Sequence, residues 1–64
     1  MSKILIVEDE DAIRRVLKKV LIEESPKYII DEAINGDQAI SLIKTNNYDL
    51  VLCDIKMPKK DEIY

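Results

Sequence analysis

Two stretches of this chain decide its fold: Lys3-Ile4-Leu5-Ile6-Val7-Glu8-Asp9-Glu10 and Asp49-Leu50-Val51-Leu52-Cys53-Asp54-Ile55-Lys56-Met57-Pro58. Each contains a short apolar run followed by acidic residues. Continuous apolar runs bounded by charge are typical of parallel strands buried on both faces. We therefore expect strands over residues 3–8 and 49–54, the second of them covered on both faces.

From Asp11 onward, the apolar residues recur with the spacing of a helix. One stripe at positions i, i+3, i+4, i+7 and i+8 is apolar and predicts a face that packs on the sheet, whereas a basic set falls on the opposite, solvent-facing side. The apolar stripe is Ile13, Val16, Leu17, Val20 and Leu21, and the basic set is Arg14, Arg15, Lys18 and Lys19. Ser25-Pro26 should end this helix, because a residue before proline is pushed out of the α region.

A second strand and a second helix complete the pattern. Residues 28–33 read as a less apolar strand that suits an edge position. Asn35-Gly36 signals a turn, and Asn35 with Gln38 resembles a capping box at the start of a helix that carries Ala39, Ile40, Leu42 and Ile43. Strand, helix, strand, helix, strand predicts an α/β fold with a parallel sheet and right-handed crossovers.

Composition narrows the class of protein. The 64 residues allow one small domain, with a net charge of −3 and a sequence pI near 4.8. No cluster of Lys and Arg suggests contact with nucleic acid. One Cys and no His rule out an internal disulfide and a Cys/His zinc site. No apolar run approaches the roughly 20 residues of a membrane span, and no signal peptide is evident, so we expect a cytoplasmic protein.

Three carboxylates point to a site. Glu8, Asp9 and Asp54 follow two buried strands, and the carboxyl ends of parallel strands lie at one edge of the sheet. Such a pocket suits a hard divalent cation. A plainer interpretation makes Asp54 a strand-end residue that starts a turn, and makes two of residues 8–11 simple complements of the helix dipole.

Together these motifs resemble the receiver domain of two-component response regulators. The matching residues are Ile4 to Glu10, then Asn35-Gly36-Asp37-Gln38-Ala39, then Asp49 to Pro58. The resemblance implies a flavodoxin-like fold, whose five strands run in the order 2-1-3-4-5. This chain matches only strands 1–3 and helices 1–2, so residues 1–64 would form a partial receiver domain without strands 4–5 and helices 3–5. We expect a truncated (βα)2β unit of strand order 2-1-3.

The resemblance also implies the roles of single residues. Asp54 would be the phosphoacceptor, Asp9 a direct Mg²⁺ ligand and Glu8 a ligand acting mainly through water. The backbone carbonyl of Lys56 would supply a further oxygen. The phosphodonor would be a sensor histidine kinase or a small phosphate such as acetyl phosphate.

Other interpretations compete at single positions. Haloacid-dehalogenase-like phosphotransferases also phosphorylate an Asp at a strand end, but they carry a second Asp two residues later, where this chain has Lys56. We expect Cys53 to be an inert, buried core residue rather than a redox group. Met57-Pro58 would shape the loop rather than take part in chemistry.

The family residues that are missing limit the expected activity. Receivers place a Ser or Thr after strand 4 and a Lys after strand 5, and Lys59 or Lys60 cannot be assumed to replace that Lys. The usual Gly of the following loop is Glu62 here. We therefore expect no enzyme, and self-phosphorylation at Asp54 that is impaired.

The sequence also predicts that this chain assembles with another copy. Without strand 4, the apolar third strand would be an exposed edge, so we expect the sheet to be completed by dimerisation or strand exchange. Two functions remain open: a Mg²⁺-dependent phosphoacceptor in two-component signalling, or a non-catalytic half-domain that acts by self-association or docking.

Overall fold

The computed structural model describes residues 2–54. The elements follow in the order β1 (Lys3–Glu8), α1 (Asp11–Glu24), β2 (Ile29–Ala33), α2 (Gly36–Thr45) and β3 (Leu50–Asp54). All strand pairs are parallel and the strand order is β2-β1-β3. The predicted α/β class and the order 2-1-3 are confirmed, and the arrangement is that of the first (βα)2β part of a flavodoxin-like receiver fold.

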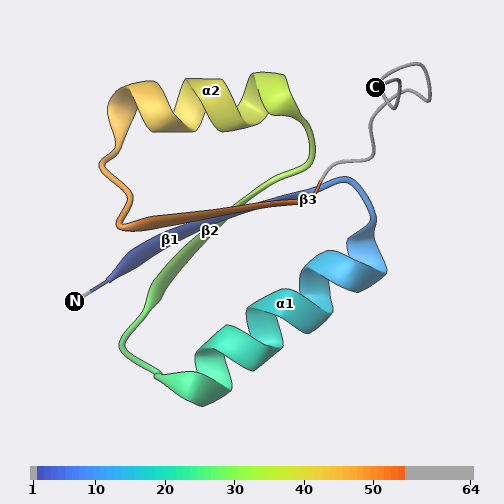
Figure 1. The fold of residues 1–64 in the computed structure, drawn as a ribbon, viewed down its shortest axis with the longest axis vertical. Helices are drawn as coiled ribbons and strands as arrows, with labels where there is room; N and C mark the ends of the chain where they lie inside the picture. The colour runs from blue at the N-terminus through green and yellow to red at the C-terminus, as the bar shows by residue number, and fades with distance from the viewer. Residues whose placement is uncertain (1, 55–64) are drawn as a thin grey trace, which may run out of the picture.

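The two helices cover opposite faces of the sheet (Figure 1). Leu5 and Val7 of β1 pack with Ala33, Ala39 and the half-buried Leu42 and Tyr48 on the α2 face. Side chains alternate along a strand, so Ile4 and Ile6 point to the α1 face. Every residue of β1 from Ile4 to Glu8 is buried, because β1 is the central strand and both helices contact it.

Helix α2 begins as the sequence predicted. The Asn35 side chain accepts a hydrogen bond from the Gln38 N–H at 2.8 Å, and the Gln38 side chain accepts one from the Ile34 N–H at 3.0 Å. This is a reciprocal cap of the capping-box type, with the second bond one residue earlier than usual. Helix α1 ends at Glu24, where the Ser25 N–H closes the last turn on the Leu21 carbonyl, also as predicted.

The packing of α1 differs from the prediction. Of the apolar stripe, only Leu17 and Leu21 are half-buried, whereas Ile13, Val16 and Val20 are exposed. Only one side of the stripe faces β1 and β2, and no described element covers the other side. Arg14, predicted to face solvent, has a side chain that is only 14% exposed, because it folds back onto the sheet.

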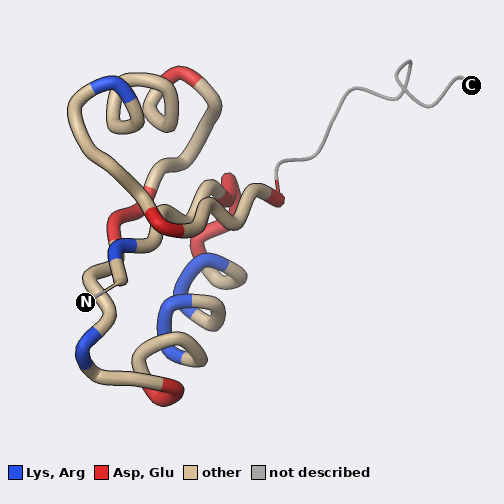
Figure 2. The backbone as a smooth tube through the Cα atoms, turned by 60° about the vertical axis from the view of Figure 1, so that its left-hand side comes forward, with Lys and Arg blue, Asp and Glu red and all other residues tan. Residues whose placement is uncertain are grey.

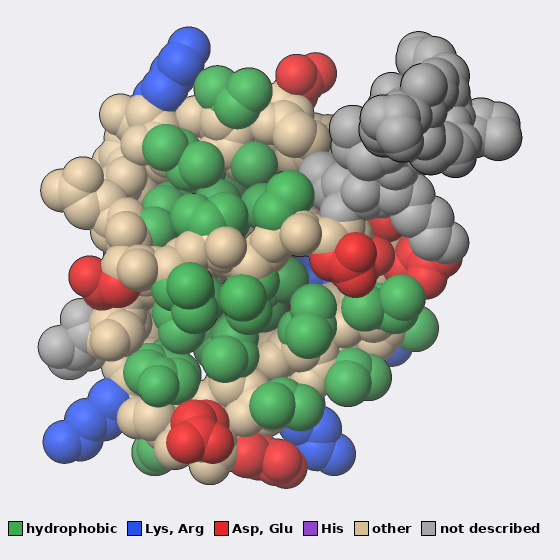
Figure 3. Space-filling model, in the orientation of Figure 1, with side chains coloured by type: hydrophobic (Ala, Val, Ile, Leu, Met, Phe, Trp, Pro, Cys, Tyr) green, Lys and Arg blue, Asp and Glu red, His purple; other side chains and the backbone are tan. Residues whose placement is uncertain are grey.

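Strand β3 is also less covered than predicted. Leu50 is 46% exposed and Val51 is 40% exposed. Cys53 is also exposed, although the sequence predicted it to lie in the core. Both helices lie over β1 and β2, which leaves β3 as an apolar edge. Figure 3 shows hydrophobic side chains on both sides of this edge. The expectation that helices would bury β3 on both faces was therefore wrong for the described residues.

Neither helix in the described part of the chain is long and apolar enough to cross a membrane. Several residues of the sequence-based expectations lie outside the described residues: Lys56 with its carbonyl, Met57-Pro58, Lys59, Lys60 and Glu62.

Candidate phosphoacceptor site

Glu8 and Asp54 come together at the carboxyl end of the sheet. They are the last residues of β1 and β3, and they are register partners in the parallel pairing of these strands. Register partners on neighbouring strands point to the same face, here the face that α1 covers. The acidic segments at the ends of the two strands lie close together in Figure 2. The register thus brings two of the three expected site residues, Glu8 and Asp54, side by side, and their roles stay a prediction.

The carboxylate of Glu8 is buried and only half satisfied. Glu8 is 1% exposed, and its Oε2 accepts a hydrogen bond from the Glu10 N–H at 3.0 Å. Its Oε1 is buried and has no hydrogen-bond partner among residues 2–54. A buried acceptor that lacks a partner is costly, so this oxygen is suited to a cation or a water molecule bound to one.

Neighbouring acidic residues affect the pKa of Glu8. The Glu10 N–H lowers the pKa of Glu8, but burial, the Asp9 side chain and the negative charge of Asp54 together raise this pKa above its ordinary value of 4.5. Like charges close to one another favour protonation unless a cation neutralises them. The acidic end of the sheet is therefore an electrostatically unfavourable cluster that a cation would relieve.

Asp9 and Asp54 differ from Glu8 in their surroundings. Both are exposed, since Asp9 follows the end of β1 and Asp54 lies on the edge strand. Within residues 2–54, no three Asp, Glu, Cys or His side chains are arranged to hold a metal ion. The carboxylate oxygens nevertheless fit Mg²⁺ in kind, because this ion prefers hard oxygen ligands and keeps several waters. The Lys56 carbonyl, the remaining expected ligand, lies outside the described residues.

Arg14 is a site-adjacent residue that sequence reasoning missed. Its Nη1 donates to the Glu8 carbonyl at 2.9 Å, and its Nε donates to Glu32 Oε1 at 3.0 Å. It also forms an ion pair with Asp11. The available signal was the position of Arg14 one helical turn after Glu10. The helical period instead predicts that all four basic residues of α1 face solvent.

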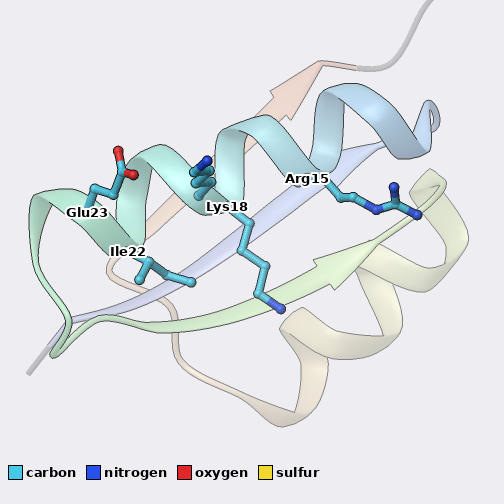
Figure 4. A pocket seen from close by; sticks show the side chains of 5 residues that line it. Arg15, Lys18, Ile22 and Glu23 are labelled. Carbon is cyan, nitrogen blue, oxygen red and sulfur yellow. The ribbon is translucent and has the colours of Figure 1, made fainter.

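Two surface hollows lie away from Glu8, Asp9 and Asp54. One on α1 is lined by Arg15, Lys18, Lys19, Ile22 and Glu23 (Figure 4), and another on α2 is lined by Asp37, Gln38, Ser41 and Leu42. Neither includes Glu8, Asp9 or Asp54. The acidic site is thus identified by strand register and charge rather than by a cavity.

Fold and site together define an α/β domain with acidic residues at the carboxyl ends of its first and third strands. Residues 4–63 match the response regulator receiver domain. The chain belongs to this family. Receiver domains of response regulators act in two-component phosphotransfer signalling and take phosphate from histidine kinases; beyond accepting the phosphoryl group they are generally not enzymes.

Two transcriptional regulators illustrate the similarity. The chain is 52% identical over 62 residues to the transcriptional regulatory protein ResD of Bacillus subtilis, and 48% identical over 62 residues to the transcriptional regulatory protein SrrA of Staphylococcus aureus. Each alignment covers 97% of this chain and 25% of the relative. The chain therefore spans about a quarter of the length of these curated relatives. No solved structure gave a match.

Proposed function

We propose that this chain is a Mg²⁺-dependent phosphoacceptor segment of two-component signalling, with Asp54 as the residue that is phosphorylated. The observation that carries the proposal is the register pairing of Asp54 with the buried, half-satisfied Glu8. Glu8, Asp9, Asp54 and the Lys56 carbonyl would hold Mg²⁺. When bound, this ion would neutralise the negative charge that spreads over the phosphoryl oxygens.

The reaction is a direct transfer of the phosphoryl group. A carboxylate oxygen of Asp54 forms a bond to phosphorus while the bond to the donor breaks, and the donor leaves with the electron pair. The product is an acyl phosphate. The exposure of Asp54 at the end of the edge strand supports this role, because a donor can approach it. We propose a sensor histidine kinase or a small acyl phosphate as the donor, in the cytoplasm, and no nucleic-acid contact by this segment, whose net charge is −3.

Residues 1–64 carry the acidic part of the proposed site. We propose that residues 1–64 form the partial domain with strands 1–3 and helices 1–2. The family's Ser or Thr and Lys that contact the phosphoryl group follow strands 4 and 5, and these 64 residues contain no counterpart that can be matched to them.

The test is incubation of the folded chain with acetyl phosphate and Mg²⁺, followed by intact mass measurement. We expect a mass increase of one phosphoryl group that disappears with EDTA and in Asp54→Asn. Asp37→Asn, a matched change of an exposed Asp at the start of α2, should keep the increase. No increase in a folded, Mg²⁺-supplied sample would contradict the proposal.

A second candidate function is self-association through the β3 edge. Edge strands without charge are prone to pair with other chains. The outer strand β2 carries Asp31 and Glu32, whereas Leu50 to Cys53 of β3 carry no charge and include two exposed apolar residues. A second copy pairing with β3 would cover them.

Sedimentation velocity over a range of micromolar concentrations tests this second function. We expect a dimer that Val51→Lys converts to a monomer, because a lysine on an edge strand opposes pairing. Ile29→Lys places the same charge on the other edge strand and should leave the dimer intact. A concentration-independent monomer would contradict this candidate function without affecting the phosphoacceptor proposal.

A further inference from the structure

Arg14 links α1 to the loop that carries the acidic residues. Although it is an arginine on a helix, its side chain is only 14% exposed. Its guanidinium contacts residues from three places: the Glu8 carbonyl at the end of β1, Glu32 on β2 and Asp11 in the first turn of α1. An arginine with so many partners is held in one orientation and can in turn hold its partners.

The contacts of Arg14 fall on both ends of the loop Glu8–Glu10. Its Nη1 donates to the Glu8 carbonyl at 2.9 Å, and its backbone N–H donates to the Glu10 carbonyl at 3.0 Å. Inside the loop, the Glu10 N–H holds Glu8 Oε2 at 3.0 Å. The turn between β1 and α1 is therefore tied at its first carbonyl, at its last carbonyl and at the Glu8 carboxylate.

We propose that Arg14 is a positioning residue for the acidic site. By holding the last carbonyl of β1, its guanidinium fixes the backbone that carries Glu8, the register partner of Asp54, and the following Asp9. This inference rests on the proposed phosphoacceptor function and names a residue that supports it without touching the phosphoryl group. Replacing a residue that orients metal ligands in this way typically weakens metal binding about 10- to 100-fold.

The neighbouring cations lack this arrangement. Lys18 pairs with Glu32 at 3.0 Å, and no hydrogen bond joins it to Glu8 within residues 2–54. Arg15 lines the exposed hollow on α1 (Figure 4). A guanidinium presents several N–H donors in a rigid fork, whereas a lysine ammonium on its flexible stem is a point charge. Lysine at position 14 should keep the pairing with Glu32 and lose the simultaneous bond to the Glu8 carbonyl.

The experiment compares Arg14→Gln and Arg14→Lys with Arg15→Gln and Lys18→Gln. Mg²⁺ dissociation constants are measured by calorimetry in trimethylamine N-oxide at a concentration that keeps every variant folded by circular dichroism. The rate of phosphorylation by acetyl phosphate is followed at low and at saturating Mg²⁺. We expect both Arg14 variants to bind Mg²⁺ about tenfold or more weakly, with rates that recover as Mg²⁺ saturates, and both controls to stay within twofold of the unsubstituted chain.

The outcomes separate the two proposals. If the folded Arg14 variants bind Mg²⁺ within twofold of the unsubstituted chain, Arg14 has only a structural role and the inference is wrong. If Lys18→Gln weakens Mg²⁺ binding as much as Arg14→Gln, the effect comes from general charge and the inference is also wrong. If the unsubstituted chain binds no Mg²⁺ and accepts no phosphoryl group, the proposed function itself fails, and the inference fails with it.

Discussion

Glu8 and Asp54 are register partners at the carboxyl end of the parallel pair β1 and β3, yet Glu8 is buried and Asp54 is exposed. The difference follows from strand position: β1 is central and covered by both helices, and β3 is an edge. One carboxylate is thereby held in place under α1, while the other is accessible to a donor. This division suits a site in which one acid supports a cation and the other reacts.

The raised pKa of Glu8 predicts how stability depends on pH. The folded state favours the protonated form, so the contribution of Glu8 is lost as pH rises from the ordinary value of 4.5 through the raised pKa. Glu8→Gln should therefore increase the urea midpoint of the Mg²⁺-free chain at pH 7, and the gain should vanish below pH 4. Mg²⁺ should stabilise the unsubstituted chain more than the variant. Glu24→Gln, at the end of α1, is the control; a lower midpoint for Glu8→Gln at pH 7 would refute this prediction.

The buried β1 should dominate stability. Leu5→Ala removes a fully buried side chain and should cost about 2–5 kcal/mol in the free energy of unfolding, enough to unfold much of a chain this small. Leu50→Ala, the same substitution at a residue 46% exposed on β3, should cost about 1 kcal/mol or less. Urea unfolding followed by circular dichroism measures both. The comparison applies to the monomer and is made at a concentration at which sedimentation shows no dimer; equal costs under that condition would contradict the prediction.

Glu32 joins α1 to β2 and should stabilise the fold above acidic pH. Its hydrogen bond with Lys18, assisted by that with Arg14, lowers the pKa of Glu32 despite partial burial. The stabilisation is present above the ordinary value of 4.5 and is lost as pH falls through the lowered pKa. Glu32→Gln should lower stability at pH 7 by about 1 kcal/mol or less, because the pairs are near the surface. The loss should shrink in 1 M NaCl; an effect that persists unchanged in high salt would argue against ion pairing as its cause.

Tyr48 should make the fold sensitive to alkaline pH. Burial and a hydrogen bond from its hydroxyl to Asp31 at 2.6 Å raise the pKa of Tyr48 to about 12. The neutral phenol is favoured in the folded state, so its contribution is present below pH 10 and is lost between pH 10 and about 12. Tyr48→Phe should cost about 1–2 kcal/mol at pH 7 and remove this part of the alkaline loss. Tyr28→Phe is the matched control, and an alkaline loss unchanged in Tyr48→Phe would disprove the assignment.

Local sequence signals predicted the helices and strands well. They predicted less well which side chains of these elements are buried. Charge-bounded apolar runs, the Ser25-Pro26 stop and the Asn35 cap each depend on neighbouring residues, and the structure has all of them. Burial depends on what packs from elsewhere. Val16, Val20 and Cys53 look like core residues in sequence, but they are exposed because no described element packs against them.

The acidic residues and the strands that end in them could be predicted from the sequence alone, because residue type and short-range periodicity specify both. Three relationships depend on how the elements pack together: Glu8 and Asp54 are register partners, Glu8 Oε1 is buried without a partner among residues 2–54, and Arg14 turns back onto the Glu8 carbonyl. These relationships join residues of separate elements. They are set by strand pairing and by the way α1 lies across the sheet, which no local pattern encodes.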